Sequence, residues 1–466
     1  MKKILSIFAI AGTLLFAGCS TDEPDDITPA EPAPKLVSWT QEGSASSQTV
    51  VLTFDQNVMC PTAERGSITV NNGATIASID AYMADVTVRL ADLEPESSYE
   101  LRFPKGTIKG YKENIAEEVS VTVKTPEVPK PVEQEIAEKL VTENPIANAV
   151  RLYDYLRSIY GYKSLSSAIA KVNWNTDEAD WIAEWTGKYP AIATFDYIHL
   201  CFSPANWIDY GDITPAKKWF DAGGIVSACW HWNVPKRQGS NDYTCTPSET
   251  EFKSSNALIE GTWENDCVKA DLEKIAGYLL QLQDEGIPVI WRPLHEAAGN
   301  TYTQWHSGAW FWWGAAGAEN YKALWRTMFD CFRNAGLRNL IWVWTTQTSS
   351  DEDSDYAFYP GDDYVDIIGK DIYNNSSAAA IFSEYNAVLA RTPRKMITLS
   401  EFGNVAPIAS QWSTGAKWLY FMPWYDYDND GSEGYKHEHA TISWWKEAFD
   451  SDMVIDRSQL PSDLYE

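Results

Sequence analysis

Two kinds of hydrophobic periodicity divide this chain. Between residues 35 and 125, apolar and polar residues alternate with a period of two, as in residues 50–55, 86–90, 99–103 and 119–124. Such alternation places every second side chain on one face of a β-strand. Several short strands of this kind, separated by turns rich in Gly, Asn and Pro, predict a small β-sandwich.

After Val141 the pattern changes to helical segments that alternate with short apolar runs. Residues 144–161 place Leu152 and Leu156 at helical spacing, and Pro145 suits the first turn of such a helix. Apolar runs without alternation are typical of parallel strands buried on both faces. The candidate strands are residues 165–170, 191–200, 224–232, 288–296, 339–346, 365–373, 395–402 and 420–426, with further helices at 268–286 and 320–337.

Eight strand–helix units between residues 141 and 466 predict a (β/α)8 TIM barrel. The main alternative is an open doubly wound sheet, but no Gly-rich phosphate loop follows the first strand. The expected fold class is therefore α/β, with a TIM barrel preceded by a small all-β sandwich. Residues 49–58 and 93–110 of that sandwich resemble bacterial Ig-like domains. A spacer role is expected for it, and carbohydrate binding is the alternative.

The N-terminus predicts an exported lipoprotein. Lys2 and Lys3 precede an apolar run, and the signal ends in "AGC" at Cys19. This pattern is an export signal, too short and wrongly flanked for a membrane span. Its end resembles a bacterial lipobox, in which Cys19 becomes lipidated, whereas plain secretion is the alternative. Residues 20–34 resemble the acidic export tag of Bacteroidetes-type surface lipoproteins, so the expected location is the outer membrane, facing outward.

The composition shifts define five expected segments. They are a signal peptide (1–19), an acidic, Pro-rich tether (20–34), an Ig-like sandwich (35–125), a Pro-rich linker (126–140) and a catalytic barrel (141–466). The tether has nothing to bury and is expected to be solvated. The chain is expected to act as a monomer.

The charge of the chain narrows the class of partner. With 37 Lys and Arg against 65 Asp and Glu, the formal net charge is −28. This balance argues against nucleic acid, whose phosphates need a basic face, and against membranes except through a lipid anchor. A neutral polymer fits better. The 22 Trp are expected mostly in the core, although a groove that grips flat apolar faces would also use them.

No cofactor or metal ion is expected. The cysteines after Cys19 are scattered without a CxxC motif, which argues against a disulfide scaffold or a zinc ribbon, although Cys245 and Cys267 could pair. "DYDNDG", with Asp426, Asp428 and Asp430, resembles the start of a calcium loop. Its twelfth position is His437 instead of Glu, so we interpret it as an acidic loop.

Polar residues gather where the predicted strands end, and barrel active sites lie at the C-terminal ends of strands. Two glutamates on one rim predict glycoside chemistry. A retaining hydrolase needs a carboxylic acid that protonates the leaving oxygen and a carboxylate, roughly 5–5.5 Å away, that attacks the anomeric carbon. The strand ends contribute His231, His295, Glu296, Asp371, Tyr373, Glu401 and Trp424.

The neighbours of the two glutamates suggest supporting roles. Asp371 and Tyr373 are expected to hydrogen-bond the attacking carboxylate and keep it charged. Trp310 and Trp424 are candidates to cover the apolar face of a sugar ring. His231 is equally compatible with a satisfied, half-buried histidine. "HEAAG" lacks the second His of a zinc-binding HExxH motif.

Four motifs together, "RPLHEAAGN", "AWFWWG", "GKDIYN" and "LSEFGN", resemble glycoside hydrolase family 26, chiefly endo-β-1,4-mannanases, over about residues 141–451. The resemblance implies a retaining (β/α)8 hydrolase in which Glu296 is the acid/base and Glu401 is the nucleophile. It also implies that Tyr373 contacts the nucleophile. The expected substrate-binding residues are His231, His295, Trp310, Asp371, Tyr373 and Trp424.

The chain departs from the family pattern in residues 297–309, which lengthen the segment between the His-Glu pair and "WFWWG". This extension puts the subsite preference in doubt. The expected substrate is mannan, glucomannan or galactomannan. The alternatives are a β-glucanase acting on lichenan, a xylanase of the same family, and a glycan-binding surface lipoprotein without catalysis. The last alternative predicts a missing carboxylate, and both are present.

Overall fold

The computed structural model divides into two compact units, residues 1–126 and 127–466. The predicted signal peptide, Cys19 and most of the predicted tether lie outside the residues that the structure describes. Within the described residues, no helix combines the length and apolarity needed to cross a membrane. The described ranges are 32–43, 48–94, 96–125, 135–171, 174–301, 308–348 and 351–466.

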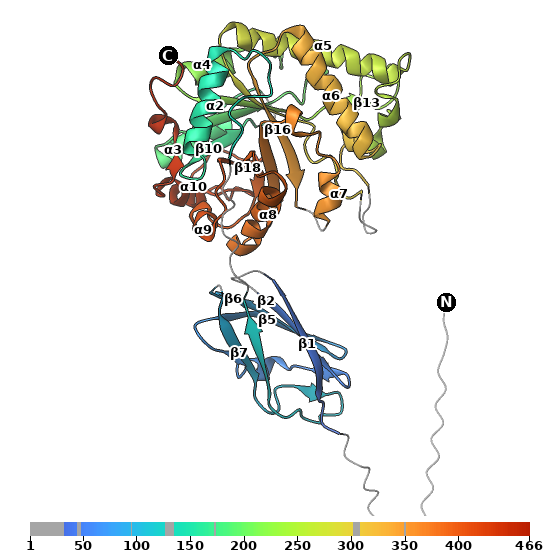
Figure 1. Ribbon diagram of the computed structural model, residues 1–466, viewed down its shortest axis with the longest axis vertical. Helices are drawn as coiled ribbons and strands as arrows, with labels where there is room; N and C mark the ends of the chain where they lie inside the picture. The colour runs from blue at the N-terminus through green and yellow to red at the C-terminus, as the bar shows by residue number, and fades with distance from the viewer. Residues whose placement is uncertain are drawn as a thin grey trace, which may run out of the picture. The chain divides into compact units, whose positions relative to one another are not determined.

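The N-terminal unit consists of antiparallel sheets around one core (Figure 1). Val50 and Val88 from one sheet and Leu101 and Val123 from the other are completely buried, as the period of two predicts. The resemblance to Ig-like domains stays a prediction. One sheet has the order β1 (Leu36–Gly43), β2 (Gln48–Phe54), β6 (Asp85–Ala91), β5 (Thr75–Tyr82); the other has β4 (Thr69–Val70), β7 (Ser98–Phe103), β9 (Val119–Lys124); β3 (Val58–Met59) pairs with β8 (Lys109–Gly110), and α1 (Thr62–Arg65) is one turn.

Eight parallel strands of the C-terminal unit close into a barrel, because the first strand pairs with both the second and the last. All eight predicted strands are present, and the predicted TIM barrel is confirmed. Their side chains are buried almost throughout, which explains the missing alternation in the sequence. In order they are β10 (Ser164–Ile169), β11 (Ile192–Asp196), β12 (Ile225–Trp230), β15 (Val289–Pro293), β16 (Leu340–Gln347), β17 (Ile367–Tyr373), β18 (Met396–Gly403) and β19 (Tyr420–Pro423).

Helices cover the outside of this barrel (Figure 1). Leu272, Ile275 and Leu279 of the long helix α5 are buried, as their helical spacing predicts. A hairpin of β13 (Val234–Pro235) and β14 (Tyr243–Thr244) follows β12, and β20 (Val454–Ile455) adds to β10. The helices are α2 (Ala147–Ile159), α3 (Asp177–Thr186), α4 (Thr214–Asp221), α5 (Trp263–Asp284), α6 (Ala318–Ala335), α7 (Glu352–Tyr356), α8 (Ala378–Arg391), α9 (Ile408–Thr414) and α10 (Ile442–Phe449).

The segment just before Val141 packs onto the barrel. The Ala137 amide donates to the carbonyl of Arg394 (3.1 Å), and the Tyr153 hydroxyl donates to the carbonyl of Ala137 (2.9 Å). The Val141 amide donates to Asp366 Oδ1 (2.8 Å). The folded barrel unit therefore includes residues ahead of Val141.

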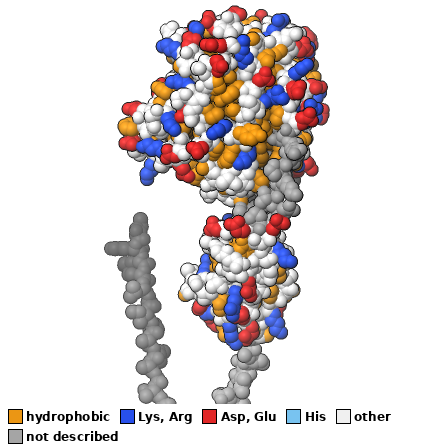
Figure 2. Space-filling model, turned by 60° about the vertical axis from the view of Figure 1, so that its left-hand side comes forward, with side chains coloured by type: hydrophobic (Ala, Val, Ile, Leu, Met, Phe, Trp, Pro, Cys, Tyr) orange, Lys and Arg blue, Asp and Glu red, His pale blue; other side chains and the backbone are white. Residues whose placement is uncertain are grey.

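Two other features of the chain bear on its chemistry. Cys245 and Cys267, whose pairing the sequence left open, are both free thiols. On the face drawn in Figure 2, acidic and basic side chains are interspersed with hydrophobic ones, and no single sign of charge covers the surface.

Candidate active site

Three carboxyl groups meet at the C-terminal end of the barrel. Glu296 follows β15, Asp371 lies in β17, and Glu401 lies beside Asp371 on the adjacent strand β18. One carboxyl oxygen from each residue lies within 4.8 Å of the other two. The two glutamates singled out by the sequence are therefore close enough to act on one bond.

Glu401 is surrounded by hydrogen-bond donors. Arg292 Nη2 pairs with Oε1, and the Tyr373 hydroxyl donates to Oε2 at 2.9 Å. His295 Nε2 lies 3.9 Å from Oε1. Arg292 is almost completely buried; burial alone would lower its pKa, but Glu401 and Asp371 reverse this and raise the pKa well above its usual value. A fixed cation and a hydroxyl donor both favour the charged carboxylate of Glu401.

Asp371 does not make the expected hydrogen bond to Glu401. It accepts one from Ser400 Oγ (2.6 Å) and pairs with Arg292 Nη1 (3.3 Å). Asp371 and Glu401 are thus held on either side of the same guanidinium group. The Ser400 hydroxyl and the Arg292 guanidinium both donate to Asp371. Asp371 can therefore accept a further hydrogen bond from the protonated carboxyl group of Glu296.

Glu296 lies in the opposite environment. It is only 8% exposed, and burial, followed by the charges of Asp371 and Glu401, raises its pKa well above the usual value. Burial also raises the pKa of Asp371. Because Asp371 has Ser400 and Arg292 as partners, we assign the shared proton to Glu296. Glu296 therefore favours its protonated form, as a general acid requires, whereas the partners of Glu401 suit a carboxylate nucleophile.

The turn that carries Glu296 has an unusual backbone. Leu294 and Glu296 both have positive φ angles, 50° and 51°. Non-glycine residues rarely adopt this region, and such strain persists only where the surroundings hold it. The buried Tyr321 hydroxyl donates to the carbonyl of Leu294 (2.8 Å). Gly314 packs so closely that an added Cβ would lie 1.8 Å from the Ala297 carbonyl oxygen, so no larger residue fits there.

The "WFWWG" segment braces two parts of the rim. Trp313 Nε1 donates to the carbonyl of His295 (2.9 Å), and Trp312 Nε1 donates to the carbonyl of Trp232 (2.7 Å). Both indoles are completely buried. These two tryptophans therefore position the catalytic loops, whereas Trp310 in the same segment is 38% exposed.

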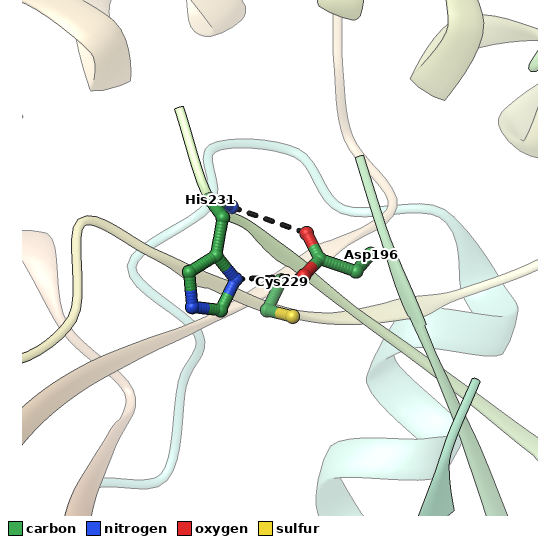
Figure 3. Close-up of side chains that lie close together, drawn as sticks. All are labelled: Asp196, Cys229 and His231. Atoms are coloured by element: carbon green, nitrogen blue, oxygen red, sulfur yellow. Dashed lines mark hydrogen bonds and ion pairs between the residues drawn. The ribbon is translucent and has the colours of Figure 1, made fainter. Parts of the chain in front are cut away.

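His231 is tied to Asp196 by two hydrogen bonds (Figure 3). Its amide donates to Asp196 Oδ1 (3.1 Å), and its Nδ1 lies 2.7 Å from Asp196 Oδ2. Burial would raise the pKa of Asp196, but the neighbouring His231 outweighs it, and the net pKa is lowered. The charged Asp196 fixes Nδ1 of His231 as a donor. The His231 ring lies 4.3 Å from the ring of His295, so this histidine is both satisfied and part of the site.

Asp196, Cys229 and His231 also have metal-type atoms within 4.8 Å of one another. Burial raises the pKa of the Cys229 thiol well above its usual value, and His231 Nδ1 is already bonded to Asp196. A cysteine binds zinc as a thiolate, and a histidine binds it through an unprotonated ring nitrogen. The raised pKa of the Cys229 thiol and the bond at His231 Nδ1 both disfavour a metal ion among these three atoms, so the cluster suits the positioning of His231.

The acidic loop after β19 uses its carboxylates internally. Asp426 accepts from the amides of Asp428 (3.1 Å) and Glu438 (2.9 Å), and Asp430 accepts from the amide of Ser432 (2.9 Å). In the described part of the chain, no cluster of metal-type side chains includes these aspartates. Their side chains serve local turns.

The three aromatic residues predicted to contact substrate, Trp310, Tyr373 and Trp424, differ in their exposure and in their neighbours. Trp424 is half-buried, with its ring 5.3 Å from that of His231, and its amide donates to the carbonyl of Phe402 (2.9 Å). Trp310 lies on the loop that follows Glu296, and residues 302–307 of that loop lie outside the described residues. Tyr373 is 36% exposed while its hydroxyl reaches Glu401.

Sequence reasoning missed Arg292, Asp196, Ser400 and His439. Arg292 and Asp196 each lie in an otherwise apolar barrel strand, and a charged residue there needs a buried partner. A charged residue within each of these apolar runs could therefore have indicated a buried ion pair or hydrogen bond. Ser400 and His439 carried none, because only the folded barrel brings Ser400 to Asp371 and the His439 ring to 5.9 Å from that of Tyr373.

Comparisons with known proteins agree with this site. Residues 141–458 match the model of glycosyl hydrolase family 26. The chain is 35% identical over 323 residues to a mannan endo-1,4-β-mannosidase from Thermothelomyces thermophilus, covering 66% of this chain and 61% of the relative. A mannan endo-1,4-β-mannosidase B from Piromyces is 31% identical over 346 residues, covering 72% and 56%. The chain thus spans about three fifths of the length of these curated relatives.

Solved structures are similar over the barrel. The family 26 domain of an endo-β-mannanase/endo-β-glucanase from Prevotella bryantii is 43% identical, with a TM-score of 0.65, covering 70% of this chain and all of that domain. A β-mannanase from a symbiotic protist of the termite Reticulitermes speratus, complexed with gluco-manno-oligosaccharide, is 32% identical, with a TM-score of 0.61, covering 71% and 99%. With the family model matching more than half of its residues, this chain belongs to glycosyl hydrolase family 26.

Proposed function

We propose that the protein is a retaining endo-β-1,4-mannanase that cleaves mannan, glucomannan or galactomannan. The observation that carries the chemistry is the pair Glu296 and Glu401, close together in opposite environments. The relatives named as mannan endo-1,4-β-mannosidases support the substrate class. The chain's membership of their family supports the reaction type.

In the first step, Glu401 attacks the anomeric carbon while Glu296 gives its proton to the glycosidic oxygen. The bond to the leaving sugar breaks, and an ester between the glycone and Glu401 forms. In the second step, the ionised Glu296 takes a proton from water, the water oxygen attacks the anomeric carbon, and Glu401 is released. Arg292 and Tyr373 hold the Glu401 carboxylate in place in both steps.

The spacing favours retention of configuration. An inverting hydrolase places its two carboxyl groups roughly 6.5–9.5 Å apart to admit a water molecule between base and sugar. One carboxyl oxygen of Glu296 and one of Glu401 lie within 4.8 Å, which is shorter than that range and close to the separation in a retaining hydrolase.

The test is a reducing-end assay on mannan, galactomannan, glucomannan, xylan and lichenan, with NMR of the first product anomer. We expect release of β-configured ends, fastest on the mannans. Activity confined to lichenan or xylan would contradict the proposed substrate, whereas the proposed mechanism would stand. With no activity on any of the five glycans, the proposal of an enzyme would fail, and a glycan-binding lipoprotein would remain.

We also infer that the protein is a lipoprotein of the outer membrane with its barrel outside the cell. The "AGC" end of the signal and the acidic tether support this location. Cys19→Ser should abolish labelling with a fatty-acid analogue and release the enzyme from the membrane fraction. Ser20→Ala is the matched control and should stay in that fraction. A membrane-bound Cys19→Ser protein would contradict the inferred anchor.

A further inference from the structure

Exposed aromatic side chains concentrate on the catalytic rim of the barrel. At or just beyond the C-terminal ends of barrel strands, the described residues place five of them on the surface. Single exposed aromatic side chains are common on protein surfaces, but a group of them on one face indicates a binding surface. They are Phe202, Trp207, Trp310, Tyr373 and Tyr427, whereas Tyr162, also exposed, precedes β10 at the opposite end.

Two of these residues form a cluster in the loop that follows β11. Trp207 is 55% exposed, the highest value for any tryptophan that the structure describes, and Phe202 is 41% exposed. Their ring centroids lie 5.6 Å apart. His199 lies 5.0 Å from Trp207, and Tyr243 of the β13–β14 hairpin lies 5.3 Å from Phe202. We name Phe202, Trp207 and Tyr243 the aromatic platform.

The loop below the platform is held in place from several sides. Ala205 and Ile208 exchange two main-chain hydrogen bonds (2.7 and 3.1 Å) and so bracket Trp207 in a tight turn. The buried Tyr210 hydroxyl accepts from the His199 amide (3.1 Å). Lys274 Nζ donates to the carbonyl of Leu200 (2.7 Å). A surface whose rings are already positioned loses little entropy when a ligand binds.

The platform is continuous with the catalytic site. Asn233 Nδ2 donates to the carbonyl of Ile198 (2.8 Å), and Asn233 stands two residues after His231. Tyr210 also donates from its hydroxyl to the carbonyl of Asp196, the residue that holds His231. The platform therefore begins where β11 and β12 leave the barrel, beside the histidine at the edge of the site.

We propose that the aromatic platform binds sugar rings of the polysaccharide beyond those at the bond being cleaved, so that the enzyme favours long chains. This proposal rests on the proposed function. An aromatic face matches the apolar C–H face of a pyranose ring, and the three platform side chains carry no charge that a neutral glycan would leave unpaired. Two rings 5.6 Å apart at an interplanar angle of 51° offer adjacent faces to consecutive units of a twisted chain.

The kinetic test uses the full chain with Trp207→Ala, Phe202→Ala and the control Tyr162→Ala, which removes an exposed aromatic ring from the opposite rim. The substrates are β-1,4-linked oligosaccharides of increasing length from whichever glycan the wild type cleaves best. The platform variants should lose about tenfold in kcat/KM on the longest chains, through KM, and nothing on the shortest chain that is cleaved. Trp207→Phe, which keeps a ring, should recover most of the loss.

Two kinetic results would overturn the platform. One is an unchanged kcat/KM of the platform variants on long chains, which would mean that the exposed rings bind a protein partner instead of the glycan. The other is an equal loss at every chain length, which would mean a general effect on the barrel.

A binding test separates this proposal from the proposed function. Gels that contain galactomannan, glucomannan, xylan or lichenan should retard the wild type and Tyr162→Ala, and retard Trp207→Ala less. This result would support the platform even if no glycan were hydrolysed. If none of the four glycans retarded the wild type, or if Trp207→Ala were retarded equally, the platform would be rejected, whatever the hydrolysis assays show.

Discussion

Glu296 and Glu401 face each other across less than 4.8 Å, with Arg292 and Tyr373 bonded to Glu401 and neither of them bonded to Glu296. This asymmetry gives two identical side chains different chemistry. Burial and the charges of Asp371 and Glu401 raise the pKa of Glu296 and favour its protonated form, whereas Glu401 is bonded to a guanidinium and a phenol.

Replacing either glutamate by alanine should lower the rate on a soluble polymer by several orders of magnitude while the protein stays folded. With an activated aryl glycoside, azide should rescue Glu296→Ala and give a product of retained configuration, since that leaving group needs no acid. Azide should give Glu401→Ala a product of inverted configuration instead. Ordinary activity in Glu401→Ala would contradict its assignment as nucleophile.

The rate on a polymer should depend on pH as a bell with an optimum between about 5 and 7. Its basic limb should belong to Glu296, because the proton is lost as pH rises through the raised pKa of this residue. Asp371→Asn removes one of the negative charges that raise that pKa, so the basic limb should move to lower pH.

Two controls check the assignment of this limb. In Glu296→Ala, assayed with a good leaving group, the limb should flatten. If the limb persists unchanged in that variant, another group sets it, and His295 or His231 would be the next residue to replace. A basic limb that stays in place in Asp371→Asn would show that this aspartate does not act on Glu296.

Much of this site was visible in the sequence, because the ends of barrel strands are defined by where apolar runs stop. Glu296 and Glu401 stand at such ends, and so do His231 and Tyr373. What could not be predicted were contacts between strands far apart in sequence. Arg292 meets Asp371 and Glu401 only because β15, β17 and β18 share one barrel.

The fold shows the same division. The period of two and the loss of alternation predicted the two kinds of sheet correctly. The packing of Ala137 against Arg394 was not predictable, because no local pattern marks where a linker begins to touch the barrel. The brace made by Trp312 and Trp313 was hidden for a similar reason, since a buried indole and a sugar-binding indole look alike in a sequence.

Glu296→Gln should change stability in a way that depends on pH. The folded pKa of Glu296 is raised, so the stability contributed by its neutral form is fully present below the unfolded value of about 4.3 and is lost as pH rises through the folded pKa. The neutral glutamine avoids this loss. Thermal unfolding should therefore give equal Tm values at pH 4 and a higher Tm for the variant at pH 8. A variant that is less stable than the wild type at pH 8 would contradict a raised pKa.

Asp196→Asn should impair catalysis through His231 without touching the carboxyl pair. The amide cannot stabilise a donor at His231 Nδ1 as the carboxylate does, so the ring loses its fixed tautomer. We expect kcat/KM to fall about 10–100-fold with little change in Tm. Cys229→Ala, which alters the same buried cluster without a hydrogen bond to the ring, is the control. Equal losses of activity in both variants would point to packing as the cause.

A chain that begins at Glu127 should keep its turnover on soluble oligosaccharides within about twofold, because the barrel has its own core and its catalytic groups all lie on barrel strands and their loops.

A second, shorter chain that begins at Val141 tests the contacts made by the residues just before the barrel. It lacks Ala137, which hydrogen-bonds to Arg394 and Tyr153. It also lacks Ile136 and Leu140, which pack against the buried cluster that contains Leu152 and Leu156 of α2. Its Tm should fall by several degrees while kcat stays near that of the longer chain. Equal Tm values would show that these contacts add nothing. A loss of more than about tenfold in kcat for the Glu127 chain, still folded by circular dichroism, would mean that the N-terminal unit contributes to the site.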